Sequence, residues 1–159
     1  MSNLDLVKGL KTLLVTLVVF SISSISWQVH AAEAQVENKN NSEPMALRLI
    51  MQDLELNMQR IASAIIREDL ATVAEIAPLV ADHEQPPMTE KMQILSFMGS
   101  DAGAFKSLDG VTHDTAIMLK EVAEKNDGDA VIKTYADLLQ SCVACHQKFK
   151  QPFVDHFYR

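Results

Sequence analysis

Apolar residues recur every three or four positions along most of the chain, starting near Pro44. In the first such stretch they would share one face of a helix, at Leu47, Met51, Leu54, Met58, Ile61 and Ile65. Proline is accepted in the first helical turn, so the spacing predicts a helix from Pro44 to about Arg67.

The same period predicts further helices over residues 69–81, 89–99, 103–126 and 129–152. Asp69 and Asp129 are placed to cap two of them, and Pro152 is expected to end the last. The segment between the second and third long helices contains the Pro86-Pro87 pair. No alternating strand pattern of useful length appears. The chain is therefore predicted to be all-α, an antiparallel four-helix bundle with a long crossover between helices 2 and 3.

The first residues have the layout of a secretory signal peptide. Lys8 and Lys11 precede an apolar run over 13–20, and small residues at Ala31 or Ala34 offer cleavage sites. We expect a signal peptide over 1–31, a flexible leader over 32–43, and one domain over 44–159. An uncleaved membrane anchor is the alternative, and no membrane span is expected in the mature protein. The predicted location is the periplasm.

The net charge of the whole chain is −7, and it becomes −8 once residues 1–31 are removed. A mildly acidic chain is not a nucleic-acid binder by charge. Acidic residues could instead meet basic patches of redox partner proteins, although they also simply aid solubility.

The segment Cys142-Val143-Ala144-Cys145-His146 carries the most specific chemistry in the sequence. The spacing C-x-x-C-H is the attachment signature of c-type haem, in which each thiol forms a thioether with a vinyl group. Residues three and four apart share a helical face, so His146 would reach the iron of the same haem. We expect one covalent haem c on Cys142 and Cys145, with His146 as the proximal iron ligand.

The same residues have three other possible uses. A thioredoxin-like redox pair is expected at a helix N-terminus in an α/β pattern, which is not visible here. A structural disulfide would close a very short loop and constrain little of the unfolded chain. Zinc could use two thiolates and an imidazole, but a regular helix splays them away from a tetrahedron.

The second axial ligand is expected from the first helix. Met51 and Met58 both lie on its apolar face, and methionine opposite histidine is typical of electron-transfer haem. In antiparallel helices, His146 lies about 25 Å and Met51 about 24 Å from the shared end, whereas Met58 lies about 14 Å from it. Met51 is therefore the predicted distal ligand. Methionine is also a common core filler, so Met58 or no protein ligand stays an alternative.

Arg48, one turn before Met51, is a candidate to pair with a haem propionate, or is a plain surface cation. The remaining histidines near the domain, His83, His113 and His156, are interpreted as solvated surface residues.

With C-V-A-C-H close to the C-terminus, four helical segments, and R-L-I-M-Q-D-L-E-L-N-M in the first of them, the chain resembles the class II c-type cytochromes. The resemblance covers about residues 44–150. It implies haem on Cys142 and Cys145, His146 as proximal ligand, and Met51 as sixth ligand in the low-spin branch. It also makes a homodimer an expectation. D-L-E-L-N-M and H-Q-K-F are similar to parts of the soluble four-helix b-type cytochrome, which would make Met58 the ligand.

The sequence thus predicts a periplasmic mono-haem cytochrome that transfers single electrons between redox partners and is not an enzyme. The alternative is a five-coordinate, gas-binding haem protein of the cytochrome c-prime kind.

Overall fold

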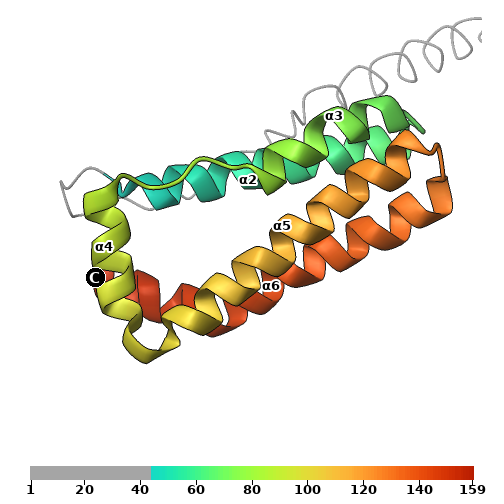
Figure 1. The fold of residues 1–159 in the computed structure, drawn as a ribbon. Coiled ribbons are helices and arrows are strands. Elements are labelled where there is room, and N and C mark those ends of the chain that lie inside the picture. Colours follow the sequence, from blue (N-terminus) through green and yellow to red (C-terminus); the bar gives the residue numbers. More distant parts are fainter. Residues whose placement is uncertain (1–43) are drawn as a thin grey trace, which may run out of the picture. The chain divides into compact units, whose positions relative to one another are not determined.

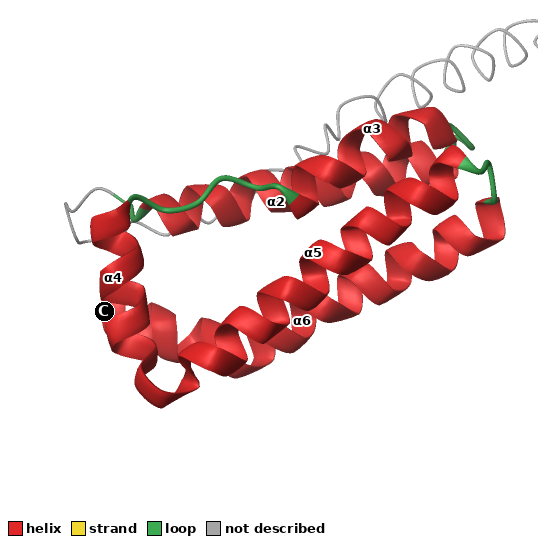
Figure 2. Ribbon diagram, viewed as in Figure 1, coloured by secondary structure: helices red, strands yellow, loops and turns green. Residues whose placement is uncertain are grey.

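A computed structural model describes residues 44–159, and every regular element in that range is a helix. The expected signal peptide and leader lie outside the described residues. The elements are α2 (Ala46–Ile66), α3 (Leu70–Ala81), α4 (Met88–Met98), the short 3-10 helix η2 (Gly99–Asp101), α5 (Ala102–Glu124) and α6 (Gly128–Tyr158). The all-helical class is confirmed for this part of the chain (Figure 2). None of these helices is long and apolar enough to cross a membrane.

Two tight turns reverse the chain, one after α2 and one after α5 (Figure 1). Each contains one residue in the left-handed region, Glu68 with φ of 58° and Asn126 with φ of 57°. Asparagine tolerates this conformation better than most residues, whereas glutamate adopts it at some cost. Asp69 and Asp127 then accept backbone hydrogen bonds at the starts of α3 and α6. The cap predicted at Asp69 is confirmed, whereas that of the last helix is Asp127 rather than Asp129.

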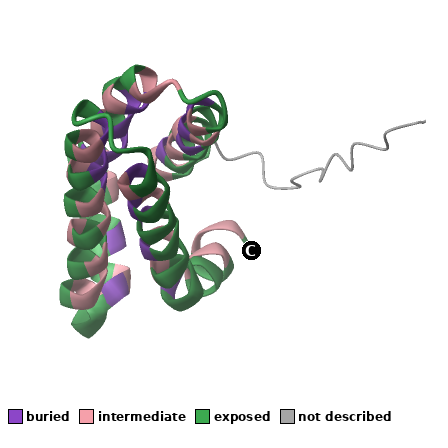
Figure 3. Cartoon of the chain, turned by 90° about the vertical axis from the view of Figure 1, so that its right-hand side faces the viewer, coloured by how far each residue is buried: buried purple, intermediate pink, exposed green. Residues whose placement is uncertain are grey.

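After its turn, α3 packs against α2, and α5 packs against both α3 and α6. The α2–α3 pair and the α5–α6 pair lie close together near the two turns and farther apart toward α4 (Figure 1). Contacts between α2 and α6 are few. The buried residues lie mainly where the helices face one another (Figure 3).

The buried apolar residues form two separate clusters. The turn-end cluster lies near the two turns and comprises Met58, Ile61, Ala64, Val73, Ile76, Ala77, Val80, Ala81, Ala116, Leu119, Ala123, Val131 and Leu138. The α4-end cluster comprises Ile94, Met98 and Phe149, packed against Met45, Leu47, Phe97, Ala102, Ala104, Phe105, Leu108, Cys145 and Phe153.

The last helix does not end at Pro152 as expected but continues to Tyr158. A proline inside a helix removes one hydrogen bond and normally destabilises it. Here the aromatic residues beyond it pack against Phe97 of α4. The ring centroid of Phe97 lies 6.2 Å from that of Phe153 and 5.3 Å from that of Phe157. This packing offsets the lost bond.

Some large apolar side chains of the long helices lie on the surface. Met118 of α5 is 56% exposed and Leu139 of α6 is 49% exposed. Of the histidines expected at the surface, His113 and His156 are exposed, whereas His83 is partly buried. The His83 side chain is 17% exposed, and the His156 ring stacks on Phe97 with centroids 4.3 Å apart.

Candidate functional site

The C-x-x-C-H segment lies well inside α6, fourteen residues after Gly128 at its nearest cysteine. Both cysteines are free thiols and half-buried. His146 follows on the same side of the helix, since residues four apart are neighbours on its surface, and it is more exposed. The helix therefore presents two thiols and an imidazole from one stretch of its surface, as the sequence predicted for a regular helix.

The surroundings keep the two thiols protonated. Burial raises the pKa of Cys142, which outweighs the hydrogen bond from Ser141. Burial likewise raises the pKa of Cys145, with smaller contributions from the Asp109 carboxylate and from Cys142. A helix interior offers no N-terminal dipole to favour a thiolate. These thiols are therefore not activated nucleophiles.

Partial desolvation, with a smaller contribution from the nearby Lys150 charge, lowers the pKa of His146. A histidine with a lowered pKa is neutral at physiological pH, and the neutral imidazole is the form that binds a metal. The side chain can therefore offer a ring nitrogen to a metal without first losing a proton.

The motif sits where one apolar cluster gives way to the other. Along α6 the turn-end cluster ends at Leu138, and the α4-end cluster begins at Cys145. On α2, residues 48–53, which include Met51, lie between residues of the two clusters. On α5, residues 109–115 lie between them in the same way. Three helices therefore have a segment between the clusters, and these segments carry Met51 and Cys142, while Cys145 and His146 lie where the α4-end cluster begins.

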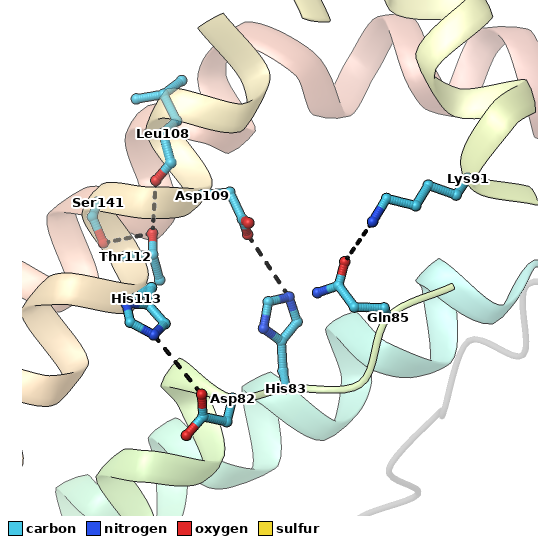
Figure 4. A network of polar contacts seen from close by, with 9 residues as sticks. All are labelled: Asp82, His83, Gln85, Lys91, Leu108, Asp109, Thr112, His113 and Ser141. Atoms are coloured by element: carbon cyan, nitrogen blue, oxygen red, sulfur yellow. Dashed lines mark hydrogen bonds and ion pairs between the residues drawn. The ribbon is translucent and has the colours of Figure 1, made fainter. Parts of the chain in front are cut away.

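Near the level of the motif, polar contacts link α5 to the segment that follows α3 (Figure 4). His83 Nε2 lies 3.8 Å from Asp109 Oδ1, and His113 Nε2 lies 3.8 Å from Asp82 Oδ1. Because the Asp109 carboxylate also contributes to the raised pKa of Cys145, these contacts extend to the neighbourhood of the motif.

A second polar contact fixes the motif against α5. Thr112 Oγ1 donates to Ser141 Oγ at 2.9 Å (Figure 4). Ser141 Oγ in turn donates to the Leu138 carbonyl at 2.7 Å. Ser141 is buried and directly precedes Cys142. The chain of two hydroxyls therefore sets the rotation of α6 at the first cysteine.

The two candidate methionines occupy different surroundings. Met58 is 9% exposed and belongs to the turn-end cluster, while its carbonyl accepts a hydrogen bond from Tyr135 Oη at 3.1 Å. Met51, two turns earlier on the same face of α2, is 38% exposed and belongs to neither cluster. Met58 therefore has a complete packing role, whereas the Met51 thioether does not.

Arg48 was considered as a propionate partner, and here its guanidinium lies over the ring of Tyr158, 5.4 Å from the centroid. Four residues that sequence reasoning missed also shape the region: Asp109, Tyr135, Glu90 and Tyr158. The α6 extension that carries Tyr158 did leave a signal, because Phe149, Phe153 and Phe157 recur every four residues across Pro152. The two backbone amides that donate to Glu90 left no signal in the sequence, since they are more than forty residues away from it.

Within residues 44–159, no three His, Cys, Asp or Glu side chains gather so that they could hold a metal ion by themselves. Haem iron does not need such a group, because the porphyrin supplies four of its ligands. The donor set therefore fits haem better than a bare ion. Compared with known protein families, curated proteins and solved structures, the chain has no match.

Proposed function

We propose that the protein is a mono-haem c-type cytochrome with haem attached through Cys142 and Cys145, and with His146 as the proximal iron ligand. The donor set supports this: two free, half-buried thiols and an imidazole on one stretch of α6. Their spacing matches the attachment signature.

The observation that carries the proposal is the position of this segment at the boundary of two apolar clusters, with Cys142 between them and Cys145 in the α4-end cluster. A porphyrin is a large, flat, apolar group with charged propionates at one edge. It is best accommodated where apolar side chains lie to either side and the core does not already close on itself. The segments of α2, α5 and α6 that belong to neither cluster meet this requirement.

A thiol–disulfide role fits the same residues less well. Redox-active C-x-x-C cysteines sit at helix N-termini with lowered pKa values. In this protein they lie inside a helix of 31 residues, and burial raises both pKa values.

Met51 is proposed as the sixth iron ligand, in preference to Met58. The hydrogen bond from Tyr135 to the Met58 carbonyl joins α6 to α2, and both helices leave it toward the α4 end. Seven residues, or about 10 Å of helix, separate Met58 from Met51 on α2, and the same number separate Tyr135 from Cys142 on α6. Met51 and Cys142 therefore lie at about the same level. By the same rise, the level of His146 lies about 6 Å along the helix axis from that of Met51 and about 16 Å from that of Met58.

Haem, when bound, supplies a one-electron ferric–ferrous couple. Cys142 and Cys145 would attach it, His146 and Met51 would bind its iron, and the surrounding apolar side chains would limit reorganisation. We propose an electron carrier of the periplasm rather than an enzyme, exported by a signal peptide over 1–31 and serving redox partner proteins. By its motif and helix order it is similar to the class II cytochromes, and an antiparallel four-helix bundle with a crossover through α4 is the arrangement we propose for it.

Gas binding at the sixth position is the second candidate function. It is favoured by the small number of contacts between α2 and α6. A ligand carried by a helix that packs weakly against the haem helix is more easily displaced by carbon monoxide or nitric oxide.

The test is to produce the full chain together with haem-attachment machinery and record its spectra. We expect a Soret band that stays with the protein after denaturation and acid–acetone extraction, and a weak ferric band at about 695 nm from methionine ligation. Cys142→Ser and Cys145→Ser should lose covalent haem, while Val143→Ala, with the motif intact, should keep it. A high-spin spectrum that shifts with carbon monoxide would favour gas binding. Colourless protein with both thiols open to alkylation would refute haem attachment.

A further inference from the structure

The first turn of α2 is capped by another part of the chain. Its N-cap residue, Met45, provides no side-chain hydrogen bond, and the first turn contains no acidic residue. The Glu90 carboxylate in the first turn of α4 instead accepts hydrogen bonds from the Ala46 and Leu47 amides, both at 2.8 Å. A carboxylate at this place satisfies two otherwise unpaired N–H groups and complements the helix dipole.

The C-terminal end of α6 reaches the same turn. The Arg48 guanidinium lies over the Tyr158 ring, and Tyr158 is close enough to Glu90 for that carboxylate to influence its phenol. Met45 and Leu47 also pack in the α4-end cluster. We call Glu90 and Tyr158 together the clasp, because they hold the first turn of α2 from two sides.

Met51 follows Leu47 by four residues, one turn farther along the same uninterrupted helix. On its other side, the nearest hydrogen bond from α6 to α2 is that of Tyr135, two turns away at Met58. Packing between α2 and α6 adds little. Apart from the packing of α2 on α3, the position of Met51 relative to α6 is therefore set by one anchor at Met58 and by the clasp at the start of the helix.

We propose that Glu90 is a positioning residue for the sixth iron ligand, holding Met51 at the haem by capping α2 from α4. This rests on the proposed function, in which Met51 is that ligand. Glu90 does not contact the iron. It lowers the freedom of the turn that carries the thioether, so that methionine competes better with water and other ligands for the sixth position.

The experiment is an imidazole titration of the ferric, haem-loaded full chain, because imidazole must displace the methionine to bind. For Glu90→Gln we expect roughly five- to tenfold tighter apparent imidazole binding, corresponding to loss of a charged helix cap. The matched control is Glu84→Gln, an exposed carboxylate between α3 and α4, which should leave the titration unchanged. Tyr158→Leu, which removes the Arg48 partner, should act in the same direction as Glu90→Gln.

Two further measurements separate positioning from general loosening. In a Met51→Leu background, Glu90→Gln should no longer alter imidazole affinity, because no methionine competes. Amide hydrogen exchange at the start of α2 should be faster in Glu90→Gln, a readout that does not depend on the iron.

The outcomes distinguish the two proposals. A wild-type protein with covalent haem and the 695 nm band, but with equal imidazole affinity in Glu90→Gln and Glu84→Gln, would overturn the positioning role alone. A persistent Glu90→Gln effect in the Met51→Leu background would overturn it too. Wild-type protein without methionine ligation would overturn both the sixth-ligand assignment and the role of Glu90.

Discussion

Replacing each candidate methionine by alanine separates ligation from packing. Met58 is 9% exposed inside the turn-end cluster, whereas Met51 is 38% exposed and lies outside both clusters. Truncating a buried methionine leaves a cavity and costs about 2–5 kcal/mol. We therefore expect Met58→Ala to destabilise the fold by about 3 kcal/mol and to keep the low-spin spectrum. Met51→Ala should give a high-spin spectrum with a packing loss below about 1 kcal/mol.

Stability should be measured by urea unfolding of the ferric proteins in saturating imidazole. Imidazole then fills the sixth position in every variant, so the free-energy differences report packing without the methionine–iron bond. Spectra are recorded on the same samples before imidazole is added. A high-spin Met58→Ala beside a low-spin Met51→Ala would refute the assignment based on helix level. Equal packing losses in the two variants would refute the assigned difference in burial.

Three further predictions follow from the polar contacts and the thiols. Thr112→Val removes the donor to the buried Ser141 hydroxyl and should lower the free energy of unfolding by about 1 kcal/mol, measured in urea. Hydrogen bonds from Thr72 hold the pKa of Asp69 below its ordinary value, so its contribution is present above about pH 4 and is lost as pH falls through the lowered pKa. Asp69→Asn should therefore flatten the acid side of the stability profile. In haem-free protein, burial should make Cys142 and Cys145 react with iodoacetamide at pH 8 more slowly than a cysteine peptide, and faster reaction would contradict the raised pKa values.

Local sequence signals predicted the helices well, because caps and apolar spacing act over a few residues. Asp69 caps α3 as expected, and the helical placement of Cys142, Cys145 and His146 follows from their spacing alone. The prediction that α6 ends at Pro152 is wrong because aromatic residues beyond the proline pack against Phe97 of α4, a contact that the local sequence does not show. A proline marks the end of a helix only when no residue beyond it is buried by packing.

Features that depend on distant partners could not be read from the sequence. The Glu90 cap joins residues 44 positions apart, and the Tyr135 hydrogen bond joins residues 77 apart. Periodicity placed both Met51 and Met58 on the apolar face of one helix, but it carries no information about where a core is interrupted. That difference emerged only when the helices were packed together and the apolar residues separated into two clusters.

The contact between Arg48 and Tyr158 joins the beginning of the domain to its penultimate residue. The pairing spans 110 residues, so it forms only when both ends of the domain have come together, whereas the helix around Cys142, Cys145 and His146 depends on local spacing. Removing the last turn of α6 should therefore loosen the start of α2 while leaving the residues that would attach haem unchanged.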